Sequence, residues 1–150
     1  RRLFSRLTII ENLRMGAYAP QVRKKTNQML EHIFDLFPIL AERKTQLSST
    51  LSGGEQQMLA IARALMSDPQ MLLIDEVSLG LSPLVTNDVY RKIDDINKEG
   101  ISILLVDQNV TRSVEVSNRT YVLRQGRVVL EGNSSDLSAQ EVKKAYFGLR

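Results

Sequence analysis

The chain has 150 residues, of which 43% are hydrophobic and 25% are charged. These values are ordinary for a soluble globular domain, and they exclude a disordered or collagen-like chain. The 20 Lys and Arg against 17 Asp and Glu give a formal charge of +3. Because the basic residues are spread along the chain in short runs, we expect no nucleic-acid partner.

The residue types that are missing exclude several kinds of site. There is no cysteine, so disulfides, thiol catalysis and thiolate zinc sites are excluded. The single histidine, His32, excludes a multi-histidine metal site and is expected to have a structural role. No apolar run approaches the roughly 18–20 residues that cross a bilayer. The first residues, Arg1-Arg2-Leu3-Phe4, have neither an initiator Met nor a signal-peptide pattern, and we expect them to begin inside a longer protein.

The first third of the chain predicts helices. Thr8 and Glu11 have the spacing of a capping box, which predicts a helix running toward Tyr18. Pro20 begins a second predicted helix, and Pro38 ends it. Its apolar residues share one face at helical spacing: Val22, Met29, Ile33, Phe34 and Phe37. Residues 42–50 are polar and predict a connection.

The middle of the chain alternates helices with short apolar runs. Ser52-Gly53-Gly54-Glu55 is a second capping-box pattern and predicts a helix that ends before Pro69. The apolar runs 71–74 and 101–106 have the length of strands buried on both faces. Between them, Ser82-Pro83 begins a helix that Gly100 ends.

The last third predicts a short helix at about 110–116, then two strands at 121–123 and 128–130 joined at Gln125-Gly126. Short helical segments follow over 136–147. The alternation of strands and helices predicts an α/β fold with a mostly parallel sheet.

Two motifs can carry chemistry, and each also has a purely structural interpretation. Glycines at a helix N-terminus leave backbone N–H groups uncovered, and together with the helix dipole these suit a phosphate. The same Ser-Gly-Gly-Glu pattern can be a simple helix cap. Asp75-Glu76 places two carboxylates at the carboxyl edge of a sheet, where one can hold Mg²⁺ and the other can orient water. They can equally be two acids that end a strand.

The order of these motifs resembles a known family. LSGGEQQ at residues 51–57, an apolar strand ending in Asp75-Glu76, and Ser78-Leu79-Gly80-Leu81 resemble the signature, Walker B and D-loop of ABC-transporter ATPases. Residues 7–18, 56–65, 104–109, 121–123 and 128–132 resemble one branch, the second ATP-binding subunit of bacterial branched-chain amino-acid importers. The resemblance covers nearly the whole chain.

The resemblance implies a role for each matching residue. Ser52, Gly53 and Gly54, with help from Gln56, would contact the γ-phosphate of ATP held by the opposite subunit of a head-to-tail dimer. Asp75 would bind the Mg²⁺ shell, directly or through water, and Glu76 would be the general base. Ser78, Leu79 and Gly80 would line the dimer interface as the D-loop.

Two positions depart from the family pattern. Val77 stands where proline is frequent, which loosens the turn and removes no chemistry. Gln108 aligns with the switch position, where histidine is common, and counts with Glu76 as a catalytic residue. Glutamine can donate a hydrogen bond to a phosphate oxygen but cannot carry a proton charge. Alternatively, Gln108 caps the helix that begins near Asn109.

The phosphate loop G-x-x-x-x-G-K-[ST] does not occur in the sequence. The resemblance therefore implies a partial P-loop NTPase fold without its N-terminal Walker A portion. Residues of about 8–67 would form the helical and signature subdomain, and about 68–150 the Walker B, D-loop, switch and C-terminal part. The isolated chain is expected to be inactive, whereas its parent would hydrolyse ATP with Mg²⁺.

The resemblance also implies partners and a location. The parent would pair with a second ATPase subunit and with transmembrane permease subunits on the cytoplasmic face of the bacterial plasma membrane. The alternative is a truncated, non-catalytic module that self-associates or pairs with an intact ATPase, and we expect a homo-oligomer of the isolated chain because a strand edge at 101–106 is left open. A DNA-maintenance ATPase shares the signature, but the long coiled-coil insertions of that group are not in this sequence.

Overall fold

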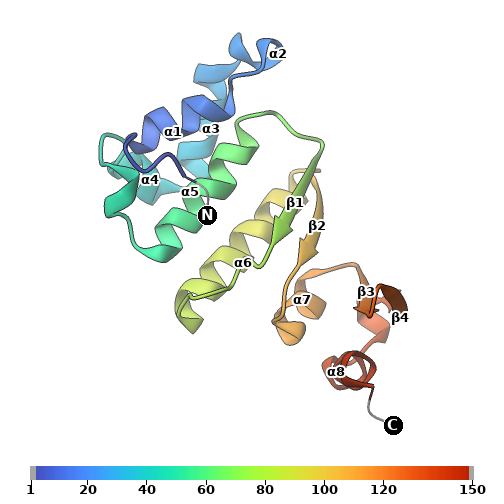
Figure 1. Ribbon diagram of the computed structural model, residues 1–150. Helices are drawn as coiled ribbons and strands as arrows, with labels where there is room; N and C mark the ends of the chain where they lie inside the picture. Colours follow the sequence, from blue (N-terminus) through green and yellow to red (C-terminus); the bar gives the residue numbers. More distant parts are fainter. Residues whose placement is uncertain (1–2, 149–150) are drawn as a thin grey trace. The chain divides into compact units, whose positions relative to one another are not determined.

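The structure is a computed structural model that describes residues 3–148, and its contacts divide it into two compact units with a boundary after Leu104 (Figure 1). The first unit combines a helical part with strands, and the second contains a hairpin and helices. The predicted α/β class is therefore confirmed. The predicted subdivision near residue 67 concerns motif roles and stays a prediction.

Four helices form the beginning of the first unit: α1 (Ile9–Gly16), α2 (Pro20–Arg23), α3 (Thr26–Leu36) and α4 (Pro38–Glu42). The capping box at Thr8 is confirmed, since the Thr8 N–H donates to the Glu11 carboxylate at 2.8 Å and the Glu11 N–H donates to the Thr8 hydroxyl at 3.4 Å. The single predicted helix over 20–37 is wrong. It is interrupted at Lys25, whose ψ of 0° lies outside the helical range. Pro38 also begins a new helix, because its missing N–H costs nothing at a first helical position.

The chain before α1 is irregular but firmly held. The fully buried Asn12 side chain accepts from the Phe4 N–H at 3.0 Å and donates to the carbonyls of Phe4, Leu7 and Thr8. Backbone bonds then join this segment to the chain after α4: Ile9 N–H donates to Gln46 O, and Ser48 N–H donates to Leu7 O, each at 3.0 Å. The predicted polar connection over 42–50 is thus a strap that contacts the beginning of α1, and it ends in the short 3-10 helix η1 (Ser48–Thr50).

Helix α5 (Gly53–Leu65) lies at the centre of the first unit and packs along α1. The contact is close at Gly16, because a Cβ there would lie 2.0 Å from the backbone oxygen of Arg63. At its other end α5 packs on α6 (Pro83–Lys98), which begins at the predicted Ser82 cap. The apolar residues of these helices contribute a large share of the core: Ile9, Leu13, Leu59, Ala62, Leu65, Val89, Ile93 and Ile96.

Strands β1 (Met71–Asp75) and β2 (Ser102–Val106) are neighbours in a two-stranded sheet, joined through α6. The prediction that both strands are buried on two faces is wrong. Only alternate residues of β1 are buried, Leu72 and Ile74, while Leu73 is 72% exposed. In β2, Leu104 and Val106 are likewise more than half exposed. The apolar runs have the composition of central strands, but in the described chain one face of this sheet is uncovered.

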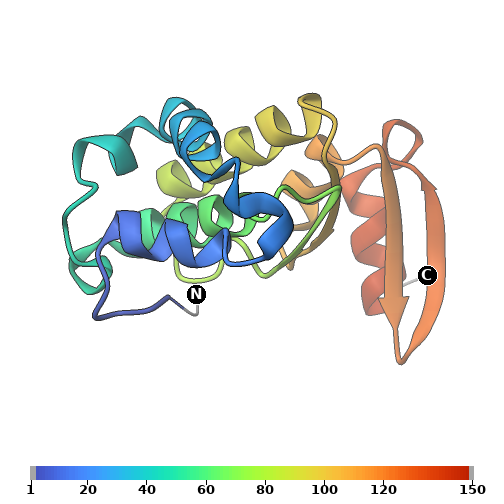
Figure 2. The same ribbon diagram turned by 90° about the horizontal axis from the view of Figure 1, so that it is seen from above.

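The second unit contains α7 (Val110–Val116), β3 (Arg119–Arg124), β4 (Arg127–Asn133), η2 (Ser134–Asp136) and α8 (Ala139–Phe147). The predicted hairpin is confirmed: β3 and β4 pair antiparallel, and α8 lies against them (Figure 2). Its two turn residues, Gln125 and Gly126, have φ of +51° and +74°, as a tight two-residue hairpin turn requires. Among residues 3–148, no helix has both the length and the apolar character needed to cross a membrane.

Candidate functional site

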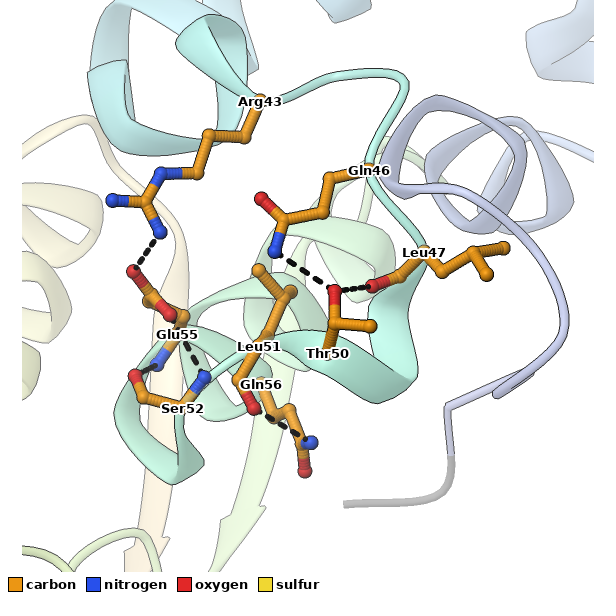
Figure 3. Close-up of polar contacts among 8 residues, drawn as sticks. All are labelled: Arg43, Gln46, Leu47, Thr50, Leu51, Ser52, Glu55 and Gln56. Atoms are coloured by element: carbon orange, nitrogen blue, oxygen red, sulfur yellow. Dashed lines mark hydrogen bonds and ion pairs between the residues drawn. The ribbon is translucent and has the colours of Figure 1, made fainter.

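The first part of the candidate site is the N-terminus of α5, where a capping box fixes the backbone (Figure 3). The Glu55 N–H donates to the Ser52 hydroxyl at 3.3 Å, and the Ser52 N–H donates to the Glu55 carboxylate at 2.8 Å. Arg43, just beyond α4, holds the other oxygen of Glu55 at 3.0 Å. The carboxylate is thus fixed by the turn and by the helical part together.

The capping box determines which backbone donors remain for a ligand. A helix begins with N–H groups that have no intrahelical acceptor. Here the box engages those of Ser52 and Glu55, so the amides suited to an outside acceptor are those of Gly53 and Gly54. Gly53 is half-buried and Gly54 is buried, but neither has a side chain to cover its amide, and Ser52 beside them is exposed. This end of α5 therefore offers oriented donors and the positive end of a helix dipole to an anion.

The side chain of Gln56 hydrogen-bonds to the backbone before the helix, whereas the Ser52 hydroxyl caps the helix itself. Its amide nitrogen donates to the carbonyl of Leu51 at 3.0 Å, which ties it back to the residue before the cap (Figure 3). Its backbone N–H donates to Ser52 O at 2.9 Å, as the first regular bond of the helix. In this arrangement Gln56 supports the turn.

Within residues 3–148 three capping boxes form, with Glu11, Glu55 and Glu141, and each of these glutamates has a lowered pKa. The Ser52 N–H lowers the pKa of Glu55, and the Ser52 hydroxyl and Arg43 act in the same direction against partial burial. The N–H and hydroxyl of Thr8 lower the pKa of Glu11, and those of Ser138 lower the pKa of Glu141, with the hydroxyl dominant there. In each case the folded chain favours the ionised carboxylate.

We therefore expect the chain to lose stability in acid. A pKa lowered by folding adds stability that is present at neutral pH and is lost as the pH falls through the folded pKa, because the unfolded chain then binds more protons. Thermal unfolding should show the loss below about pH 4.5. Replacing Glu11, Glu55 and Glu141 by Gln should flatten this dependence, whereas Glu31→Gln, on an exposed residue outside the boxes, should preserve it. An unchanged acid dependence in the triple variant would contradict this explanation.

The second part of the site is the turn after β1. Asp75 ends the strand and Glu76 follows it, and both are exposed. Glu76 has a φ of +51°, an uncommon conformation for a residue with a side chain. Val77 is 1% exposed, so its side chain is packed in the interior, and the prediction that valine loosens this turn relative to proline stays a prediction. The Leu79 N–H donates to Glu76 O, and the Leu81 N–H donates to Ser78 O, so Ser78, Leu79 and Gly80 form a hydrogen-bonded loop that leads to the Ser82 cap.

The chemistry of this turn fits a divalent cation only in part. No three side chains of His, Asp or Glu come together as a metal site within residues 3–148. A Mg²⁺ ion commonly takes one or two carboxylates and completes its shell with water and phosphate oxygens. Asp75 fits that mode of binding, provided that a phosphate ligand supplies the remaining oxygens.

Gln108 belongs to the second unit and follows β2 and precedes α7 in the chain. The alternative prediction that Gln108 caps the following helix is wrong. Asn109 is the cap, since its side chain accepts from the Arg112 N–H at 3.3 Å, and its own N–H donates to the Asp107 carboxylate at 2.8 Å. The first unit thus contains the α5 N-terminus and the Asp75–Gly80 turn, while Gln108 belongs to the second unit.

Sequence reasoning missed two close contacts, one at each end of α5, of which the contact at Gly54 lies in the site. Gly16 and Gly54 each face another part of the chain at a distance that excludes a side chain. A glycine within a helical pattern indicates a close approach of another part of the chain. The sequence does not indicate which part, because the neighbouring residue is remote in sequence.

Comparison with known proteins matches residues 1–78 to the ABC transporter family. The chain is 44% identical over 149 residues to the high-affinity branched-chain amino acid transport ATP-binding protein BraG of Pseudomonas aeruginosa, covering 99% of this chain and 64% of that protein. It is 36% identical over 143 residues to the probable branched-chain amino acid transport ATP-binding protein LivF of Archaeoglobus fulgidus, covering 93% and 59%.

Solved structures agree on the fold. The chain superimposes on cbiO1 from Clostridium perfringens, part of the ABC transporter complex cbiONQ, with a TM-score of 0.81 at 24% identity, covering 99% of this chain and 59% of that one. The chain thus spans about three fifths of the length of the proteins that it matches. By its sequence and fold, the chain belongs to the ABC transporter family of ATP-binding proteins.

Proposed function

We propose that this chain is the signature and Walker B part of an ABC-transporter ATP-binding subunit, whose complete form couples ATP binding and hydrolysis to the import of branched-chain amino acids. The observation that carries the proposal is the capped N-terminus of α5, with the Gly53 and Gly54 amides left for an anion. The substrate class is supported by the 44% identity to a protein that bears that name.

The α5 N-terminus would complete an ATP site on a partner subunit. The Gly53 and Gly54 amides and the Ser52 hydroxyl would donate to the γ-phosphate, while Gln56 keeps the turn in shape. A serine hydroxyl can accept one hydrogen bond and still donate another. The Glu55 N–H donates to this hydroxyl, and the hydroxyl proton can be directed to a phosphate oxygen.

The turn after β1 would act on ATP bound to the same subunit. Asp75 would hold Mg²⁺, which offsets phosphate charge when it is bound. Glu76 would accept a proton from the attacking water, since a carboxylate is a suitable general base. Gln108 would donate to a phosphate oxygen, and Ser78, Leu79 and Gly80 would lie along the interface between the two subunits.

The proposed assembly has two kinds of component, ATP-binding subunits and permease subunits. Two ATP-binding subunits would join head to tail, and transmembrane permease subunits would receive their motion. The pair would sit on the cytoplasmic face of the bacterial plasma membrane, held there by those permease subunits.

A chimera tests the proposal. In it, this chain replaces the part of the Pseudomonas relative that it matches, and the rest of the relative is kept. We expect the chimera to hydrolyse ATP and to restore import of branched-chain amino acids in a strain lacking the relative. The isolated chain should show no ATP turnover above background, because its sequence has no phosphate loop. A chimera that folds but never hydrolyses ATP would contradict the proposal, and so would normal turnover by the isolated chain.

The alternative function, a self-associating module, is favoured by one observation: the uncovered apolar face that includes Met71, Leu73 and Leu104, each more than half exposed. Exposed apolar sheet surface promotes association. We expect the isolated chain to form an oligomer by light scattering, and Leu73→Lys to shift it toward the monomer. The exposed Leu84→Lys, at the first turn of α6, is the control. A monomeric wild-type chain at high concentration would exclude this alternative.

A further inference from the structure

Val85, in the first turn of α6, supplies the atoms nearest to Gly54 at the N-terminus of α5. Gly54 is the second residue of α5 and is buried. A Cβ at Gly54 would lie 2.1 Å from Val85 Cγ1, and the next nearest atoms, at 3.4 and 3.7 Å, also belong to Val85. A side chain at Gly54 is therefore excluded by Val85 of the same chain, whether or not a ligand is bound.

Both the backbone and the side chain of Val85 are restricted in their motion. Its N–H donates to the hydroxyl of Ser82, the cap of α6. The chain reaches that cap directly from the D-loop, whose Leu81 N–H donates to Ser78 O at 3.2 Å. A β-branched side chain in a helix has one strongly preferred rotamer, so the Val85 methyl groups have little freedom to move away from α5.

We infer that Val85 is a positioning residue, which fixes the backbone of the α5 N-terminus at Gly54 against the first turn of α6. A side chain at residue 54 would overlap Val85, and this is one reason why the residue is glycine. A close approach of phosphate to the backbone is a second, separate reason. The packing part of this inference stands on the contact alone. Its consequence for ATP turnover rests on the proposed function.

A cycle of variants in the chain itself tests the packing. Alanine is favoured over glycine in a helix, so Gly54→Ala would stabilise the chain if nothing stood in the way. We expect it instead to lower the thermal midpoint by about 5 °C. Because Val85→Ala removes both methyl groups, Gly54→Ala should cost nothing further in that background. In the background of Val89→Ala, a buried residue one turn along α6, the loss should persist.

The same variants in the chimera test the positioning role. Gly54→Ala should lower ATP turnover about a hundredfold, as a displacement near 1 Å can do. The Gly54→Ala, Val85→Ala chimera should recover at least part of the turnover, and the Gly54→Ala, Val89→Ala chimera should recover none.

The outcomes separate the two proposals. If Gly54→Ala lowers the thermal midpoint as much in the Val85→Ala background as in the wild-type chain, or if the single variant Gly54→Ala is stabilised, the inference is overturned. Recovery of stability without any recovery of turnover overturns the positioning role, because turnover then depends on glycine itself at residue 54 and not on its contact with Val85. If the unaltered chimera has no turnover, the proposed function fails, while the stability cycle still decides the packing.

Discussion

Glu76→Gln in the chimera is expected to lower ATP turnover by about 10²- to 10⁴-fold and to leave ATP binding intact. Glutamine has the same shape but cannot accept a proton from water. The backbone supports a special role for this position: Glu76 has a φ of +51°, which costs about 1 kcal/mol or more for a residue with a side chain. The turn keeps this conformation because the following Val77 is almost completely buried.

Two measurements make this result interpretable. Turnover at saturating ATP and equilibrium binding of ATP separate loss of chemistry from loss of affinity. Glu31→Gln, on an exposed face of α3, should change neither. If Glu76→Gln retained more than about a tenth of the wild-type turnover, Glu76 would not be the general base.

Gly16→Ala is expected to be the most destabilising single-methyl change in the first unit, by about 3 kcal/mol. The added Cβ would lie 2.0 Å from the carbonyl oxygen of Arg63 and 2.9 Å from Met66 Cβ. Backbone cannot yield as the end of a long side chain can, so α1 and α5 would have to separate. That separation would also expose the core between them, where Leu13 and Leu59 are fully buried.

Gly132→Ala is the matched control for this prediction. Its nearest neighbour would be Leu137 Cδ1 at 3.4 Å, an ordinary contact with a flexible side chain. Chemical denaturation of the chain should show a large loss of unfolding free energy for Gly16→Ala and little change for Gly132→Ala. Equal effects of the two substitutions would show that lost backbone freedom, rather than the close approach of α1 to α5, determines the result.

Local features of the fold could be predicted from the sequence, because they depend on neighbours within four residues. Thr8 and Ser52 cap their helices as their spacing to Glu11 and Glu55 predicts. The Gln125-Gly126 turn follows from the glycine and from the apolar strands around it. The end of α5 before Pro69 follows in the same way, from the backbone that proline imposes.

Features that depend on remote neighbours could not be predicted. The run Met71–Ile74 is apolar at every position, and a periodicity argument cannot tell which side of a strand another element covers. The tight seats of Gly16 and Gly54 arise from helices that are distant in sequence. Of the candidate site, the motif residues were identifiable from their order, whereas Val85 was not, because valine on the apolar stripe of a helix has no feature that distinguishes it from core.

The backbone bonds that join residues 7–9 to residues 46–48 have a consequence for chain length. They close the segment containing α2, α3 and α4 at its base, so the ends of that segment are fixed whatever lies between them. Lengthening a loop whose ends are already fixed is entropically cheap, at about 0.6 kcal/mol for each doubling. The exposed connection at Lys24, between α2 and α3, is therefore a place where this unit can accept inserted residues without disturbing the turn at Ser52.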